Sequence, residues 1–341
     1  MYRTFFGLTR SPFEISPDPF FYYGSPRHNE ALAAIYYGIR ARKGFVVVTG
    51  EVGTGKTLLI RRIQGELERG KIEFAYIFNP LLGPDDFLKY IVGDLNLPVP
   101  KTKGEALHTL NEYLIARHKK GLTTVLIVDE AQHLSAEVLE EIRLLTNLET
   151  TREKLLQIVL LGQPELDEKL DSPNLRQLKQ RVAFRCHLEP LTQLECRDYL
   201  VRRLQRAGAG VNSWKIFPDP VLAKVFEYSR GIPRLINAIG ENALIAAYAK
   251  QSKVVTEEII EEVAADLRLK VTAAAQQASA AAQLAGHDGA VLKKLIELLQ
   301  LVAAPGASIP QGLQPSSAPP PQETPSTVHP TLTEDKPTKT P

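Results

Sequence analysis

The sequence is poor in cysteine. Its 341 residues include only two, Cys186 and Cys196, which lack C-x-x-C spacing and lie in stretches that read as helical. Two thiols cannot form the disulfide framework of a small secreted domain, and their spacing does not match a zinc site. We therefore expect two reduced cysteines and no metal bound by them.

A long apolar run is also missing. No stretch of about 18 or more apolar residues occurs, so no transmembrane helix is expected. Residues 291–304 come nearest, but Lys293, Lys294 and Glu297 divide them, which indicates an amphipathic helix. Residues 1–10 do not have the layout of a secretory signal. The cytoplasm is therefore the expected location.

The chain has almost no excess of charge of one sign. Its 41 basic and 39 acidic residues give a formal net charge of only +2. Such a balance does not by itself indicate a nucleic-acid or membrane partner, although it is compatible with local basic patches.

Short apolar runs alternate with helical periodicity between Gly44 and Leu188. The runs are rich in β-branched residues and cover residues 45–49, 74–78, 124–128 and 158–161. Continuous apolar strands separated by helices are typical of a parallel sheet with helices on both faces. The sequence therefore predicts an α/β domain over residues 44–188.

Helical periodicity continues without further strand signals after Leu188. Helices are predicted over residues 193–206, 220–229, 233–250 and 256–269. Together they predict a small all-helical domain over residues 189–270, whose last helix has Thr256 as its N-cap. An Ala-rich linker and the amphipathic helix follow over residues 271–304. Residues 305–341 are rich in proline, serine and threonine, so we expect a disordered tail.

A phosphate-binding motif follows the first apolar run. Residues 50–57 read GEVGTGKT and fit G-x-x-x-x-G-K-[ST] at every fixed position. Glycines let backbone N–H groups surround phosphate oxygens, and the following helix adds the positive end of its dipole. Lys56 supplies a charge for the β- and γ-phosphates, and the Thr57 hydroxyl can bind Mg²⁺. The predicted nucleotide-binding residues here are Gly50, Glu51, Val52, Gly53, Thr54, Gly55, Lys56, Thr57 and Leu58.

The N-terminal segment, residues 1–43, is rich in aromatic residues and proline. So many rings would not stay in water, so the segment is expected to be ordered. A helix is predicted over residues 28–40. We expect the whole segment to pack on the nucleotide-binding core.

Two carboxylates end the strand predicted over residues 124–128. Asp129 at the strand tip can reach a water on Mg²⁺ beside Thr57, and Glu130 can orient and deprotonate the attacking water. An Asp-Glu pair that opens a loop is common in α/β proteins. Combined with a phosphate-binding loop, however, it indicates hydrolysis of the nucleotide.

Five further polar residues could serve such a site. Gln163 follows the strand over residues 158–161 and could hold the attacking water, or could simply cap the strand. Arg176, Arg181 and Arg185 cluster before the helical domain; one could enter a neighbouring subunit's site, or all could be solvated surface charges. Arg234 begins a predicted helix and could fold over the nucleotide, or remain a surface residue.

In this order the motifs resemble the AAA+ ATPases. More narrowly, they resemble the ExeA/GspA-type ATPases of bacterial general secretion, with TniB/TnsC-like transposition ATPases as relatives. The resemblance covers about residues 1–270 and includes YRTFFGL at 2–8, DEAQ at 129–132, LTNLE at 145–149 and GQPEL at 162–166. It implies an α/β P-loop NTPase fold with a helical lid, bound ATP with Mg²⁺, and ring-like or filament homo-oligomers with ATP between subunits.

The resemblance also implies individual roles. Asp129 corresponds to the Walker B aspartate, Glu130 to the catalytic glutamate, Gln163 to sensor 1 and Arg234 to sensor 2. Arg181 is the first choice for an arginine finger, with Arg176 and Arg185 as alternatives. The segment containing Pro12 and Phe13 is expected beside the adenine. The residues alone do not distinguish ATP from GTP; ATP follows from the resemblance.

Three functions remain open. The leading one is an ATPase that assembles or remodels a protein complex in secretion or envelope biogenesis, with the amphipathic helix and tail docking a protein client. The second is an ATP-dependent DNA-binding regulator of the transposition or replication type. The third, a nucleotide-gated scaffold with little turnover, does not need the base that Glu130 supplies. Arginines and a lysine that could contact DNA are Arg40, Arg42, Lys43, Arg61, Arg62, Arg202, Arg203 and Arg206.

Overall fold

A computed structural model describes residues 1–67, 71–78, 80–98, 100–210 and 213–269. The chain divides into one compact unit over residues 1–281 and another over residues 282–341, and all described residues lie in the first. The predictions of an amphipathic helix over residues 291–304 and of a disordered tail over residues 305–341 therefore concern residues outside the described ones.

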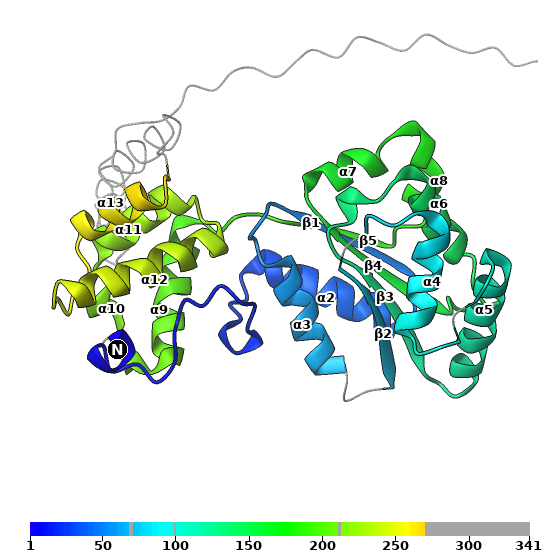
Figure 1. Ribbon diagram of the computed structural model, residues 1–341, viewed down its shortest axis with the longest axis horizontal. Coiled ribbons are helices and arrows are strands. Elements are labelled where there is room, and N and C mark those ends of the chain that lie inside the picture. Colours follow the sequence, from blue (N-terminus) through cyan, green and yellow to red (C-terminus); the bar gives the residue numbers. More distant parts are fainter. Residues whose placement is uncertain (68–70, 79, 99, 211–212, 270–341) are drawn as a thin grey trace, which may run out of the picture. The chain divides into compact units, whose positions relative to one another are not determined.

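A parallel five-stranded sheet forms the centre of the α/β region (Figure 1). Each neighbouring pair of strands is parallel, so all carboxyl ends meet at one edge of the sheet. Four of the strands confirm the predicted apolar runs. The spatial order is β2 (Ile72–Ile77), β3 (Thr123–Val128), β4 (Leu156–Gly162), β1 (Phe45–Gly50) and β5 (Phe184–Leu188).

The sequence did not predict β5. This strand pairs only with β1 at the edge of the sheet, and most of its side chains alternate between partly buried and exposed. An edge strand needs no continuous apolar run, and this one contains an arginine and a histidine. Cys186 lies on β5, which corrects the expectation of helical surroundings for that residue.

Helices cover both faces of the sheet, and each face has its own apolar cluster. Val46 and Val48 point into one cluster and Phe45 and Val47 into the other, because successive side chains of a strand alternate between faces. The first cluster includes residues of α2 (Pro26–Arg40) and α3 (Lys56–Leu67). The second includes residues of α4 (Pro84–Asp94), α5 (Lys103–Lys119), α6 (Ala136–Leu145), α7 (Pro164–Leu170), α8 (Arg176–Lys179) and the short turn η3 (Pro173–Leu175).

The remaining helices confirm the helical region predicted after the sheet. Thr192 and Glu195 form a capping box that begins the first of them, and Thr256 caps the last by accepting from the Ile259 backbone N–H. A short π-helical turn, η4 (Gln205–Ala209), follows the first helix. The helices are α9 (Gln193–Leu204), α10 (Ser213–Ile216), α11 (Asp219–Ser229), α12 (Pro233–Ala249) and α13 (Glu257–Asp266).

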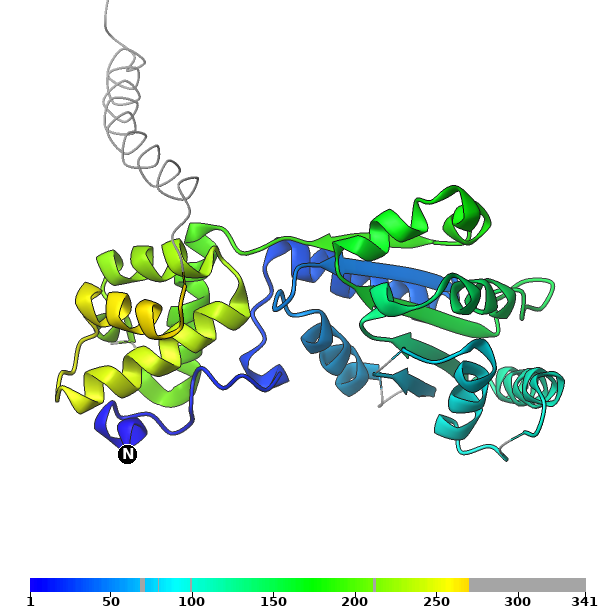
Figure 2. The same ribbon diagram turned by 45° about the horizontal axis from the view of Figure 1, so that its top comes forward.

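The N-terminal aromatic segment packs with these helices (Figure 2). It contains α1 (Tyr2–Phe5) and the turn η1 (Pro19–Phe21), and its Leu8 and Phe13 belong to the apolar cluster of the helical region. Its end packs on the sheet, through α2 and through Tyr22 just before it. This corrects the expectation that the whole of residues 1–43 packs on the nucleotide-binding core.

Of the helices in the described part of the chain, none combines the length and apolar character needed to cross a membrane.

Candidate nucleotide-binding site

The loop over residues 50–57 connects β1 to α3 at the carboxyl edge of the sheet. Gly53 and Gly55 have φ angles of 85° and 104°, a region that favours glycine. A Cβ on Gly53 would lie 2.6 Å from the Cβ of Arg234, so a side chain there would also clash. Because α3 begins at Lys56, its first N–H groups belong to the loop, as a phosphate-binding site requires.

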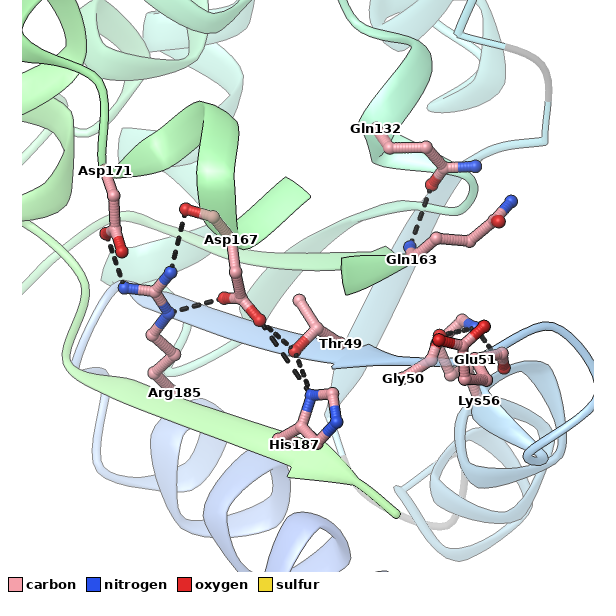
Figure 3. Close-up of polar contacts among 10 residues, drawn as sticks. All are labelled: Thr49, Gly50, Glu51, Lys56, Gln132, Gln163, Asp167, Asp171, Arg185 and His187. Carbon is pink, nitrogen blue, oxygen red and sulfur yellow. Dashed lines mark hydrogen bonds and ion pairs between the residues drawn. The ribbon is translucent and has the colours of Figure 1, made fainter. Parts of the chain in front are cut away.

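Lys56 is held at the mouth of this loop. Its side chain is buried, and its Nζ donates to the carbonyl oxygens of Gly50 at 2.6 Å and Glu51 at 3.0 Å (Figure 3). Burial lowers the pKa of Lys56 below its usual value, while the charges of Glu130 and Asp129 oppose that shift. The ammonium group therefore lies among the backbone groups that would surround phosphates.

Asp129 and Thr57, predicted as a metal-binding pair, are in contact. Thr57 Oγ1 donates to Asp129 Oδ2 at 2.9 Å, and the Glu130 backbone N–H donates to Asp129 Oδ1 at 3.0 Å. Tyr76 Oη donates to the same Oδ2 atom at 2.9 Å, a contact that sequence reasoning missed. A hydroxyl and a carboxylate at the end of a phosphate-binding loop are oxygen donors that fit Mg²⁺.

The Glu130 carboxylate is held by two side-chain amides. Its Oε2 accepts from Gln132 Nε2 at 2.7 Å and from Gln163 Nε2 at 3.3 Å. Gln132 Oε1 in turn accepts from the Gln163 backbone N–H at 3.1 Å (Figure 3). Burial raises the pKa of Glu130, but the two amides and the charge of Lys56 outweigh it, so the pKa lies below its ordinary value. The carboxylate is therefore ionised at neutral pH.

A pocket of about 190 Å³ extends from the loop to the helical region. Its lining joins four parts of the chain: the N-terminal segment, the nucleotide-binding loop with its helix, Glu130 after β3, and the helices α9 and α12. The lining residues are Glu14, Ile15, Ser16, Pro17, Asp18, Val52, Gly53, Gly55, Lys56, Thr57, Leu58, Glu130, Tyr199, Arg203, Pro233, Arg234 and Asn237.

Arg203 is a buried cation at the far end of this pocket, and it is 5% exposed. Its Nε donates to the Pro12 carbonyl oxygen at 2.5 Å and its Nη1 donates to Tyr199 Oη at 2.9 Å. Tyr199 Oη donates onward to Asn237 Oδ1 at 2.9 Å. Among the described residues, no carboxylate forms an ion pair with Arg203, and its guanidinium lies 4.6 Å from the centre of the Phe21 ring. Sequence reasoning had considered this arginine only as a DNA contact.

Phe13 lies in the apolar cluster of the helical region. Its ring has no exposed surface and meets Phe217 edge to face, with 6.0 Å between ring centres. It also packs against α12, where a Cβ on Gly240 would come within 2.9 Å of it. Phe13 does not line the pocket, and the expectation that its segment lies beside the adenine stays a prediction. Pro12 contributes its carbonyl to Arg203, and the following residues, 14–18, line the pocket.

Arg234 lies next to the nucleotide-binding loop, at the start of α12. Its backbone N–H donates to the Gly53 carbonyl oxygen at 3.2 Å, and the residue lines the pocket. The side chain is exposed and so can move toward a bound nucleotide.

The three clustered arginines differ in their contacts. Arg185 donates from Nε to Asp167 Oδ1 at 2.5 Å, from Nη1 to Asp171 Oδ1 at 2.8 Å and from Nη2 to the Asp167 carbonyl at 3.0 Å (Figure 3). Arg176 and Arg181 are exposed and make no side-chain hydrogen bond or ion pair with any residue in the described ranges. Only these two are therefore free to reach another molecule.

Asp167 also connects α7 to the strand that carries the loop. Its Oδ2 accepts from Thr49 Oγ1 at 2.5 Å, and the same hydroxyl lies 3.0 Å from His187 Nδ1 (Figure 3). Thr49 is the residue before Gly50, so the carboxylate fixes the end of β1 against β5 and α7. No motif in the sequence indicated this cluster.

His28 supports the loop from the other side. Its Nε2 lies 2.8 Å from the Thr54 carbonyl oxygen and its Nδ1 lies 2.7 Å from Ser25 Oγ. Burial lowers the pKa of His28 below 6.5, against the opposing effect of the Thr54 hydrogen bond. The neutral ring therefore donates from Nε2 to the loop and accepts from the serine hydroxyl.

Several arginines that were considered for DNA contacts bind the N-terminal segment instead. Arg61 Nη1 donates to the Pro17 carbonyl at 2.7 Å, and Arg206 Nη1 donates to the Phe20 carbonyl at 2.5 Å. With Arg203 they anchor this segment to α3 and to the α9 region. Of the three, Arg203 is buried, whereas Arg61 and Arg206 stay exposed.

A family profile described as "AAA domain" matches residues 39–170. The chain is also 48% identical over 254 residues to general secretion pathway protein A of Aeromonas hydrophila. That match covers 74% of this chain and 46% of the relative, so the chain spans about half the length of the relative.

Two solved structures share the fold. Cdc6p from Pyrobaculum aerophilum aligns with a TM-score of 0.56 and 19% identity, over 77% of this chain and 70% of its own. The Aeropyrum pernix ORC1 protein, solved in complex with DNA, aligns with a TM-score of 0.57 and 18% identity, over 76% of this chain and 69% of its own. At these identities the likeness is one of fold, and it confirms a P-loop sheet followed by a helical region.

Proposed function

We propose, for a chain that belongs to the AAA+ ATPases of the ExeA/GspA type, that it couples Mg²⁺-dependent ATP hydrolysis to the assembly or remodelling of a protein complex in bacterial secretion or envelope biogenesis. The observation that carries the proposal is the placement of Glu130. Its ionised carboxylate is oriented by the Gln132 and Gln163 amides, and it lies beside the Thr57–Asp129 pair. A protein that only binds nucleotide would not need an oriented base.

The chemistry follows from these residues. The loop N–H groups and Lys56 bind the β- and γ-phosphates, and Thr57 and Asp129 would hold Mg²⁺, which would neutralise phosphate charge. Glu130 accepts a proton from a water molecule as the water oxygen attacks the γ-phosphorus. The bond from that phosphorus to the bridging oxygen breaks, and ADP and phosphate leave. Gln163 is placed to orient the same water through its contact with Glu130.

In this proposal the protein acts as a homo-oligomer with ATP at the subunit interface. Arg181 is our first candidate for a side chain that reaches the ATP of the neighbouring subunit, with Arg176 as the alternative. Arg185 is less suited because Asp167 and Asp171 occupy its guanidinium. Arg234 would act within its own chain, over the loop.

The client is proposed to be a protein that binds residues 271–341. The ATPase is proposed to work on the cytoplasmic side, where ATP is made. The DNA-binding alternative has weaker support, because one of its candidate arginines, Arg203, is buried and donates to the Pro12 carbonyl. Turnover and particle mass that both rose on adding duplex DNA would move the proposal to that class.

The proposal is tested by replacing Glu130 with Gln. The variant is expected to bind ATP within about twofold of wild type and to hydrolyse it about 10²–10⁴-fold more slowly, because the amide cannot accept the proton. Binding is measured with a fluorescent ATP analogue and turnover by phosphate release, each with Mg²⁺ and with EDTA.

Two reference variants make the result specific. Lys56→Ala should lose ATP binding, and Glu140→Gln, on the exposed face of α6, should keep wild-type turnover. Wild-type turnover by Glu130→Gln would show that another group is the base. No turnover by the wild-type protein, with or without Mg²⁺, would defeat the enzyme proposal.

A further inference from the structure

The Asp129 carboxylate is held from two sides, and only one of them belongs to the nucleotide-binding loop. Its Oδ2 atom accepts from Thr57 Oγ1 and from Tyr76 Oη, each at 2.9 Å. Tyr76 lies on β2, opposite Ile127 of β3 in the strand register, two residues before Asp129. The two hydroxyls therefore reach one oxygen from two different elements.

We propose that Tyr76 is a positioning residue for Asp129: its hydroxyl fixes the carboxylate in the orientation that binds the Mg²⁺ of the Mg²⁺–nucleotide complex. This inference rests on the proposed function, because it assigns a role to Tyr76 only if Asp129 supports a cation. It predicts that Tyr76 sets the affinity for Mg²⁺ without contributing to metal-free binding of the nucleotide.

Tyr76 is itself well fixed. Its backbone N–H donates to Asp94 Oδ2 at 2.7 Å, and its ring packs with the apolar cluster between the sheet and α3. The ring of Phe78, two residues further on, lies against it with 4.2 Å between ring centres and a tilt of 35°. Phe78 itself is 68% exposed, so its ring lies between Tyr76 and solvent. The Tyr76 ring can therefore turn away from Asp129 only by losing its contacts with Phe78 and with the apolar cluster.

A second hydrogen-bond donor keeps the Asp129 Oδ2 atom in place when the first donor, Thr57, is engaged elsewhere. Thr57 belongs to the loop that closes on phosphates, and its oxygen is the expected ligand for the cation, so its contact with Asp129 depends on what is bound. Tyr76 does not line the pocket, so its hydroxyl reaches Asp129 from outside the nucleotide-binding loop. Groups that hold a metal-binding carboxylate in place typically change metal affinity about 10–100-fold when they are removed.

The test is Tyr76→Phe, which removes one oxygen and keeps the ring against Phe78. The affinity for a fluorescent ATP analogue is measured in EDTA and then across a Mg²⁺ titration. We expect metal-free affinity within about twofold of wild type and a rise of about tenfold in the Mg²⁺ concentration that gives half of the metal-dependent gain. Wild-type Mg²⁺ dependence in the variant would overturn the inference.

A matched control lies on α5 and contacts the same strand, β2. Tyr113 Oη donates to Glu73 Oε2 of β2 at 2.5 Å, which is also a tyrosine–carboxylate contact, but outside the pocket. Tyr113→Phe should leave the Mg²⁺ titration unchanged. An equal shift in both variants would show general loosening of β2 and would overturn the inference.

A double-variant comparison separates a role through Asp129 from any other role. In an Asp129→Asn background, Tyr76→Phe should add no further shift in the Mg²⁺ titration, because both changes act on one contact. A full additional shift would assign Tyr76 an independent role and would overturn the inference. If wild-type protein binds ATP with no dependence on Mg²⁺, the proposed function fails first; if wild type shows the dependence and Tyr76→Phe matches it, only this inference fails.

Discussion

At the phosphate end of the pocket, each functional group follows directly from a strand: the loop from β1, Asp129 and Glu130 from β3, and Gln163 from β4. At the other end, Pro12 meets Arg203 across a separation of 191 residues, and Asn237 joins them through Tyr199. The sheet fixes the first end, because the carboxyl ends of parallel strands meet. The second end exists only when the N-terminal segment, α9 and α12 come together. The chemistry is therefore built into the edge of the sheet, whereas the opposite wall of the pocket depends on contacts between distant segments.

The largest expected effect tests whether the phosphate end is complete within one chain. Arg181→Ala is expected to lower turnover about 10³-fold with ATP binding retained, because an arginine donated by a neighbour stabilises the charge of phosphoryl transfer. Turnover and binding are measured at protein concentrations above and below assembly. Arg185→Ala serves as the contrast and should act mainly on stability, since that side chain binds Asp167 and Asp171.

Mixing two inactive proteins shows whether the arginine acts between subunits. Arg181→Ala subunits keep their ATP site, and Lys56→Ala subunits keep their arginine. Turnover that reappears on mixing would place the arginine in trans. Full activity of Arg181→Ala alone would remove it and would turn attention to Arg176.

The phosphate end is also the part of the site that could be predicted from sequence. Its motifs are short, and each adjoins an apolar run that identifies a buried strand, as with Asp129 after residues 124–128. The strand β5 was missed because an edge position allows Arg185 and His187 within it. Tyr76 was missed because a tyrosine in an apolar strand does not indicate which neighbouring strand its hydroxyl reaches.

The other end of the pocket, formed by the N-terminal segment, α9 and α12, could not be predicted for a different physical reason. Arg203 lies in a helix with two other arginines, and only the fold buries one of them and leaves Arg202 exposed. The expectation that the segment containing Pro12 and Phe13 lies beside the adenine came from the family resemblance alone. In the structure the Phe13 ring packs in the apolar cluster of the helical region, and residues 14–18 line the pocket instead.

An intermediate effect is expected from Arg203→Met, which keeps the length of the side chain and removes its hydrogen bonds. The wall formed by residues 14–18 should loosen, so the KM for ATP should rise about tenfold while kcat stays within about twofold of wild type. Steady-state kinetics give both constants, and a thermal melt measures the loss of stability. Arg202→Met, at the exposed neighbouring position, should keep the wild-type KM. A fall in kcat at unchanged KM would show that the end of the pocket around Arg203 takes part in the chemical step.

The smallest expected effect concerns the support beneath the loop. Because burial lowers the pKa of His28, the unfolded protein takes up a proton before the folded one does as pH falls below 6.5. Folding stability should therefore decrease from about pH 7 to about pH 5. His28→Gln has no such histidine to protonate. Between pH 7 and pH 5 its Tm should therefore fall by about 2–4 °C less than the Tm of wild type. Parallel slopes for wild type and His28→Gln would contradict the assignment of a neutral buried ring.

The anchoring of the N-terminal segment has a consequence for the order in which the protein can mature on the ribosome. Thr9 donates to the Ala207 carbonyl oxygen across 198 residues, and Leu8 and Phe13 pack in a cluster that extends to residues of α13. The N-terminal segment is synthesised first, but some of its packing partners lie near the end of the described part. It can therefore pack only after those residues have been synthesised. The sheet, with its strands complete by Leu188, can form earlier. Translation that stops before α9 would thus give a chain with its phosphate-binding loop but without the opposite wall of the pocket.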